Sequence, residues 1–337
     1  MSKMFPGIIL IIVVGLIVYL APWFSGFFTS GSLANLSIND GVFYVSNDAG
    51  NEFQPQSDGL MVSEIIDVVF LDNQSSYLCT SQGVFKLNNL KNRWERIKDE
   101  TGVLEFPSRI SSLVFYDNQT AFVAVNKNNR GKIYFTSDNF KTLKEIYVTG
   151  QDGTEINDLK ISQSGRIYFL STEKILGYSD DNGQTFKLMT HLDRDFKKIV
   201  ISQKNNNVIY LWGDEYIYKS VDAGYNFYNL GFTLSNINDF FINNKEIIYI
   251  ATNNGAFHSF DGGWNWRLMD SLLPKDLPAG AILYNNERGE VIISFGGRLY
   301  ISQDGLAWSI KSISTNNINI IKINPFNLSQ VLVGIKK

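Results

Sequence analysis

A short acidic motif recurs along this chain about every forty residues, and it constrains the fold more than any other feature. The clearest copy is Ser179–Phe186, which reads Ser-Asp-Asp-Asn-Gly-Gln-Thr-Phe, and we call this motif the box. Close copies occupy residues 46–53, 220–227 and 259–266, and looser copies occupy 87–94, 136–143 and 302–308. The central acid or amide of the successive boxes is Asp48, Asn89, Asp138, Asp181, Asp222, Asp261 and Asp304. A repeat of this length is typical of β-propeller blades.

The residues around each box predict a β-hairpin. Short apolar runs flank the boxes, such as 215–218 before one box and 266–269 after another. An Asp side chain in a turn accepts hydrogen bonds from nearby backbone N–H groups, and glycine adopts a positive φ without steric cost. We expect the aromatic residue at the eighth position, such as Phe186, to pack against the following blade.

The acidic boxes have a second interpretation, as sites for Ca²⁺. Each box supplies one or two carboxylates, whereas Ca²⁺ takes six to eight oxygen ligands. We therefore interpret the boxes as structural turns and expect no metal and no other cofactor.

Two further apolar runs precede most boxes, as residues 65–71 and 76–80 do. With the hairpin they make four strands per repeat, which is the make-up of a propeller blade. The first box, at 46–53, lacks these two preceding strands, and the last two strands, 318–323 and 330–335, lack a box. The two incomplete ends together make one blade.

The sequence therefore predicts an all-β, seven-bladed propeller over residues 41–337, closed by the C-terminal strands pairing with the N-terminal hairpin. Closure leaves no long free sheet edge. A length of 337 residues suits one large all-β domain with an appendage, and a net charge of −3 gives no support for nucleic-acid binding. The single cysteine, Cys79, excludes an internal disulfide framework, and we expect an unreactive thiol at a strand end.

The N-terminal residues differ from the rest. Residues 5–24 are all apolar, Gly, Pro or Tyr, and about twenty such residues span a bilayer. We predict a transmembrane signal anchor there, a cytoplasmic N-terminus at 1–4 that carries Lys3, and a juxtamembrane linker at 25–40. The alternative is a signal peptide cleaved within residues 25–32. The propeller is then extracytoplasmic, in a bacterial periplasm or at the cell surface.

The box pattern Ser-x-Asp-x-Gly-x-Thr-Phe/Trp resembles the BNR/Asp-box repeat. Residues 41–337 resemble the single-propeller proteins related to the photosystem II assembly factor Ycf48 and, more distantly, sortilin-type propellers. This resemblance implies a propeller that binds a partner protein through an arginine-rich patch on one face. Sialidases and xyloglucanases carry the same boxes, so the resemblance specifies the fold more closely than the function.

The residue pattern gives little support for an enzyme. The sialidases that the boxes resemble need an arginine triad, and the arginines here are scattered. The xyloglucanase-like enzymes place two Asp in a cleft between two propellers. His191, expected in a loop, and His258, expected on a surface strand, have no partner at metal-ligand spacing. A glycosidase remains an alternative, since such an enzyme needs two carboxyl groups that face one sugar. Loops such as 99–105 and 152–155 contain several acidic residues that could supply them.

The loops opposite the boxes are the predicted binding surface, because function tends to lie on loops held by a rigid scaffold. Arginine and aromatic side chains there suit a protein interface. The candidate partner-binding residues are Arg109, Arg130, Arg194, Trp212 and Arg298. The resulting hypothesis is a membrane-anchored, extracytoplasmic propeller that binds a protein in or at the membrane, as an assembly factor or accessory subunit of an envelope complex. The alternative is a glycan-binding protein or a glycoside hydrolase.

Overall fold

The computed structural model describes residues 42–62, 64–231, 236–269, 272–275 and 277–336. The chain divides into two units, Met1–Asn39 and Asp40–Lys337, and the described residues all belong to the second. The predicted cytoplasmic segment 1–4, the anchor 5–24 and the linker 25–40 lie outside the described residues. Within the described part, no helix has the length and apolarity needed to cross a bilayer.

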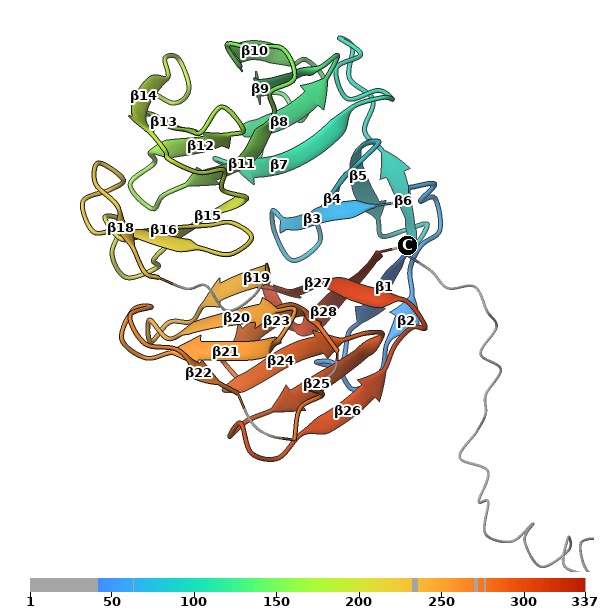
Figure 1. The fold of residues 1–337 in the computed structure, drawn as a ribbon. Coiled ribbons are helices and arrows are strands. Elements are labelled where there is room, and N and C mark those ends of the chain that lie inside the picture. Colours follow the sequence, from blue (N-terminus) through green and yellow to red (C-terminus); the bar gives the residue numbers. More distant parts are fainter. Residues whose placement is uncertain (1–41, 63, 232–235, 270–271, 276, 337) are drawn as a thin grey trace, which may run out of the picture. The chain divides into compact units, whose positions relative to one another are not determined.

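The described residues form seven antiparallel sheets of four strands each, arranged as blades around a centre (Figure 1). Blades 1 to 3 contain β3 (Ile65–Phe70), β4 (Ser76–Thr80), β5 (Gly83–Asn88), β6 (Arg93–Arg96), β7 (Arg109–Phe115), β8 (Ala121–Lys127), β9 (Arg130–Thr136), β10 (Lys144–Val148), β11 (Ile156–Ile161), β12 (Ile167–Ser171), β13 (Ile175–Ser179) and β14 (Lys187–His191). Blades 4 to 6 contain β15 (Lys198–Ile201), β16 (Ile209–Trp212), β17 (Ile217–Ser220), β18 (Tyr228–Asn229), β19 (Ile237–Ile242), β20 (Ile248–Thr252), β21 (Gly255–Ser259), β22 (Arg267–Leu268), β23 (Ala279–Asn285), β24 (Glu290–Phe295), β25 (Arg298–Ser302) and β26 (Ser309–Ser312). The predicted all-β propeller fold is confirmed.

Blade 7 is assembled from both ends of the propeller. Its strand order is β2 (Gln54–Pro55), β1 (Phe43–Ser46), β28 (Asn327–Lys336) and β27 (Asn317–Asn324). The antiparallel pairing of β1 with β28 runs from Phe43 opposite Gly334 to Ser46 opposite Val331. The predicted closure of the ring by the C-terminal strands is therefore confirmed.

Apolar clusters fill the spaces between neighbouring blades. Between blades 7 and 1, for example, the rings of Phe43 and Trp94 meet edge to face with their centroids 5.3 Å apart. The prediction that the last aromatic residue of a box packs against the following blade is wrong. Phe186 belongs to blade 3 and packs against Tyr147 of the preceding blade, 5.7 Å between centroids. Side chains alternate between the two faces of a strand, and this position is on the face toward the preceding blade.

Each well-formed box is held by its Ser and Asp side chains. In blade 3, the Ser179 hydroxyl donates to Asp181 Oδ1 at 2.7 Å and accepts the Gly183 N–H at 2.9 Å. Asp181 Oδ1 also accepts the Thr185 N–H at 2.9 Å. Gly183 has φ 79°, and a Cβ there would lie 2.5 Å from Phe122 of the preceding blade. The sequence uses glycine at this point because the backbone conformation and the close blade contact both exclude a side chain.

Two of the boxes depart from this geometry. In the box at 87–94, the Asn89 side chain donates to the Gln74 carbonyl, and Asn88 accepts the Lys91 N–H instead. The last box is one residue shorter, so Asp304 accepts the N–H groups of Leu306 and Ala307.

Candidate functional site

Charged side chains from five blades meet at the centre of the propeller. They come from the first strands of the blades, β3, β11, β15, β19 and β27, which lie nearest the centre (Figure 1). We call this set the central ring, and it comprises Asp67, Asp158, Lys160, Lys198, Asp239 and Lys322. Most of its members line a cavity of about 200 Å³.

Beta-bulges bring the carboxylates of the central ring into position. The strand pairing shifts register between Ile65 and Asp67, and equivalent shifts precede Asp158 and Asp239. A bulge adds one residue to a strand and re-aims the side chain that follows it. The three Asp residues are each the third residue of their strand, so they lie toward the face opposite the boxes.

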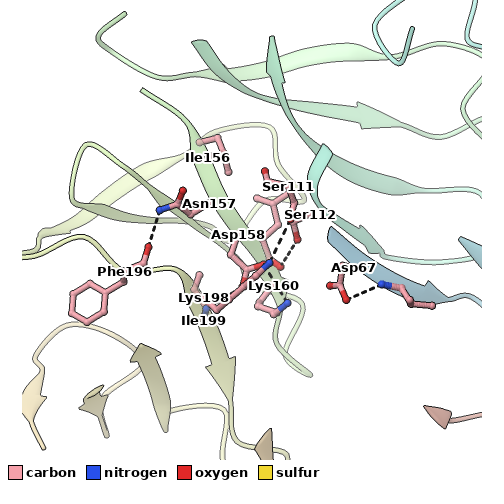
Figure 2. A network of polar contacts seen from close by, with 12 residues as sticks. Asp67, Ser111, Ser112, Ile156, Asn157, Asp158, Lys160, Phe196, Lys198 and Ile199 are labelled. Carbon is pink, nitrogen blue, oxygen red and sulfur yellow. Dashed lines mark hydrogen bonds and ion pairs between the residues drawn. The ribbon is translucent and has the colours of Figure 1, made fainter. Parts of the chain in front are cut away.

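Ion pairs form two separate groups within the central ring, one at Asp67 and one at Asp158, as Figure 2 shows. Lys322 Nζ lies 3.3 Å from Asp67 Oδ1. Asp158 Oδ1 pairs with two lysines, at 3.3 Å to Lys160 Nζ and 3.4 Å to Lys198 Nζ. The Asp158 side chain is fully buried, so its charge depends on these two ammonium groups for compensation.

The same side chains join neighbouring blades. Asp158 Oδ2 accepts the backbone N–H of Ile199 in blade 4 at 3.0 Å. Asp239 Oδ2 accepts the N–H of Ile282 in blade 6 at the same distance. In blade 2 a serine occupies the equivalent position, and Ser112 donates to the Leu159 carbonyl at 3.2 Å. The central ring therefore has a structural role between the blades in addition to lining the cavity.

The lysines keep Asp67 ionised. Burial alone would raise the pKa of Asp67, but nearby positive charges lower it to about 2. In falling order of effect, these charges belong to Lys322, Lys198 and Lys160. In return, Asp67 is the main cause of the raised pKa of Lys322. The Lys322 side chain is 45% exposed. Lys322 therefore stays charged at neutral pH, and it lines the central cavity.

Asp239 behaves differently. Burial raises its pKa to about 6, although Lys322 and hydrogen bonds from the Ile282 and Phe240 N–H groups oppose that rise. The negative charge of Asp67 adds to it. Asp239 therefore changes its charge near pH 6, whereas Asp67, with a pKa of about 2, does not.

A second polar site lies on the face opposite the boxes, between blades 1, 2 and 3. It is a groove of about 340 Å³ that we call the arginine groove, lined by Ser81, Pro107, Arg109, Asn126, Lys127, Asn128, Asn129, Arg130, Gly153 and Glu155. Arg109 lies 3.6 Å from Glu155, and Arg130 lies 3.6 Å from Asp152 and donates to the Thr149 carbonyl. Three basic side chains against one acid in the lining give this groove a net positive charge.

The predicted partner-binding residues are only partly brought together. Arg109 and Arg130 share the arginine groove, whereas Arg194 and Arg298 do not line it. Arg194 lies over the ring of Tyr216, 5.1 Å from its centroid, and Arg298 begins β25. Trp212 was expected on a loop, but it ends β16, is 6% exposed and lines the central cavity. A tryptophan buried among apolar neighbours cannot present its ring to a partner at the surface.

Two further expectations on single residues need correction. His191 ends strand β14 rather than lying in a loop, because its backbone pairs with Ile175. His258 lies in β21 as expected, but it is half-buried between Tyr249 and Phe260.

Cys79 is buried in β4, and burial raises the pKa of its thiol. In the described residues, no group of three or more His, Cys, Asp or Glu side chains has metal-site geometry.

Sequence reasoning missed the central ring. A signal for it exists, because three blades begin their inner strand with Ile-x-Asp: Ile65–Asp67, Ile156–Asp158 and Ile237–Asp239. When the blades are aligned by this Ile-x-Asp motif, which precedes the central box residue by a nearly constant 22 or 23 residues, the acids fall at one register and predict a shared location. The lysines fall at two different registers, so no equivalent pattern reveals them.

These features define a single seven-bladed β-propeller with a charged centre and box hairpins. No protein-family model and no curated protein sequence matches the chain. A solved structure described as YCF48 bound to a D1 peptide has a TM-score of 0.66 and 13% identity, and the match covers 82% of this chain and 95% of that one. YCF48 from Cyanidioschyzon merolae has a TM-score of 0.61 and 14% identity, covering 82% and 97%.

An enzyme shares the same fold. The GH74 enzyme of Niastella koreensis matches with a TM-score of 0.64 and 14% identity, covering 81% of this chain. This chain spans about half of that enzyme, since the match covers 51% of it. At these identities the likenesses show the fold alone, and the single-propeller layout agrees with that of YCF48.

Proposed function

We propose that this protein is a membrane-anchored, extracytoplasmic propeller that binds a segment of a partner protein in or at the membrane. In this proposal it acts as an assembly factor or accessory subunit of an envelope complex. The observation that carries the proposal is the arginine groove, because Arg109, Lys127 and Arg130 give it a positive charge and partly exposed donors. An acidic segment of polypeptide is the complementary ligand.

Two further points support this function. The structure of YCF48 contains a D1 peptide, so a propeller of this layout can bind a polypeptide segment. The apolar stretch at residues 5–24 is long enough to anchor the propeller beside a membrane-protein partner.

Co-purification from the native membrane tests the proposal. The anchored protein is cross-linked, its partner is identified, and recovery of that partner is compared between wild type and Arg109→Gln. Losing a charged hydrogen bond should lower recovery about 10-fold or more. The control is Arg93→Gln, which removes an exposed arginine of β6 outside the groove. Equal recovery of the partner protein with Arg109→Gln and with wild type would contradict the proposed binding site.

The alternative is a glycan-related role, which the GH74 likeness supports at the level of fold. It predicts binding on a glycan array or turnover of a polysaccharide by the purified protein. Turnover that is lost when two facing loop acids are changed to amides would replace the protein-binding proposal.

A further inference from the structure

Four blades carry a tyrosine at the same position, the second residue of their second strand. These residues are Tyr77, Tyr168, Tyr210 and Tyr249. In three of the four, a cation of the same chain lies over the ring. Lys86 lies 5.3 Å from the centroid of Tyr77, Arg166 lies 5.9 Å from that of Tyr168, and Lys219 lies 5.4 Å from that of Tyr210.

The fourth tyrosine lacks this cation. Tyr77 pairs across the strands with Lys86, and Tyr210 pairs with Lys219. At the equivalent position opposite Tyr249 the chain has His258. Burial, and then the charge of Arg267, lower the pKa of His258 below its ordinary value, so this imidazole is neutral at pH 7. Among the described residues, no Lys or Arg lies over the ring of Tyr249.

A cavity of about 350 Å³ is present beside Tyr249, between blades 5 and 6. Its aromatic lining includes Tyr249 stacked on Tyr284 at 5.4 Å, and His258 against Phe260 at 4.7 Å. Asp304 also lines it, and hydrogen bonds from backbone N–H groups lower the pKa of that carboxyl, so it is negatively charged at neutral pH. Aromatic faces with a carboxylate at the edge are the chemistry that binds organic cations.

Blade 3 shows how this protein holds a guanidinium group. Arg166 lies 4.5 Å from the centroid of Tyr178 while its Nε and Nη2 lie 2.6 and 3.1 Å from the Asp180 carboxylate. The cavity at Tyr249 also has rings and a box-hairpin carboxylate, here supplied by the neighbouring blade 6, and no Lys or Arg of the described residues lines it. Arg267, which pairs with His258 across the strands, is the cation beside it.

We propose that the cavity between blades 5 and 6 binds a cationic group from outside the chain, an ammonium or a guanidinium. This site is separate from the arginine groove and does not depend on the proposed function. The cation has two sources, a small quaternary ammonium compound or a Lys or Arg side chain of another protein, and both share the chemistry that the cavity recognises.

Titration of the propeller with choline tests the proposal, and 3,3-dimethylbutan-1-ol, its neutral isostere, is the matched ligand control. A cation–π site should bind choline about 3- to 30-fold more tightly than the isostere. Equal affinity for the two would show an apolar pocket and overturn the proposal.

The short peptides acetyl-Gly-Arg-Gly-amide and acetyl-Gly-citrulline-Gly-amide test the second source, a cationic side chain of another protein. Preference for the arginine peptide without choline binding assigns the site to a protein cation, and absence of binding by both cations overturns the proposal.

The variant His258→Lys completes the test. It supplies the cation that Lys86 and Lys219 supply in their blades, so the chain itself shows that lysine is compatible with this position. We expect His258→Lys to fold with a melting temperature somewhat below wild type, because position 258 pairs across the strands with Arg267. It should lower affinity for the cationic probe at least about 10-fold by occupying the site and repelling the probe. Unchanged affinity in a folded variant would contradict the proposed location.

Discussion

At the scale of single residues, Asp239 is the most unusual charge in the central ring. Asp67 and Asp158 have lysine partners within 3.4 Å, but no Lys or Arg of the described residues lies within ion-pair distance of Asp239. Its oxygens accept backbone N–H groups instead, and burial raises its pKa to about 6. Asp67 and Asp239 therefore differ, because nearby lysines lower the pKa of Asp67 and burial raises that of Asp239.

Asp239→Asn should change the pH dependence of stability. Between pH 3.8 and about 6, the unfolded wild-type chain releases the proton of Asp239 while the folded protein retains it. The folded state then binds more protons, so wild-type stability falls as pH rises through this window. The amide variant has no such proton, and its stability relative to wild type should rise by roughly 2 kcal/mol between pH 4 and pH 7.

Urea unfolding of both proteins at pH 4, 5, 6 and 7 measures this difference. Asp181→Asn is the control from pH 5 to pH 7, because Asp181 lies in a box hairpin outside the central ring and its pKa is about 2, so its proton is absent from both states above pH 5. A stability difference between Asp239→Asn and wild type that stays constant from pH 4 to pH 7 would contradict the raised pKa.

At the scale of elements, the box hairpin is the unit that sequence predicts best. Each box is local, so its turn follows from the residues it contains. The serine, acid and glycine of the box at 220–227 form the expected contacts, with Ser220 donating to Asp222 and accepting the Gly224 N–H, both at 2.8 Å. The direction of the aromatic residue was not predictable, because it depends on which face of the outer strand meets a neighbouring blade.

Ser220→Ala should destabilise the propeller. Ser220 is fully buried, and its hydroxyl is the acceptor for the buried N–H of Gly224. Leaving that donor without a partner costs about 1–3 kcal/mol. The matched control is Ser220→Thr, because Thr136 performs the same role in blade 2, accepting the Phe140 N–H at 3.1 Å. Thermal unfolding should show a lower melting temperature for Ala than for Thr, and identical values would argue against a role for the hydroxyl.

At the scale of the whole molecule, the phase of the boxes was enough to predict the blade count and the shared last blade. It was not enough to predict the central ring, because the ring joins side chains that are far apart in sequence and depends on bulges at the start of the inner strands. The arginine groove was half predicted. Arg109 and Arg130 meet because the turn between β8 and β9 returns to the start of β7, whereas Arg194 and Arg298 belong to more distant blades.

Removing residues 319–337 should abolish cooperative unfolding. The deletion removes β28 and most of β27, leaving β1 without its partner strand and exposing the apolar clusters on both sides of blade 7. Circular dichroism during thermal unfolding should show a broad transition in place of a sharp one.

The control is a circular permutant that joins residue 336 to residue 42 by a flexible linker and has its new ends in the loop 149–155. It keeps blade 7 and should still unfold sharply. A sharp, wild-type-like transition in the truncated protein would refute closure as the source of cooperativity.

The shared blade also determines how the propeller responds to a mechanical load. Strand β1 begins at Phe43, which pairs with Gly334 near the end of β28. The start of β1 and the end of β28 therefore lie at the same end of their hydrogen-bond ladder. Tension applied between residues 42 and 336 would therefore break the hydrogen bonds of that ladder one after another, instead of loading all of them at once. We expect blade 7 to open first under such a load, because each of the other blades is built from one continuous stretch of chain.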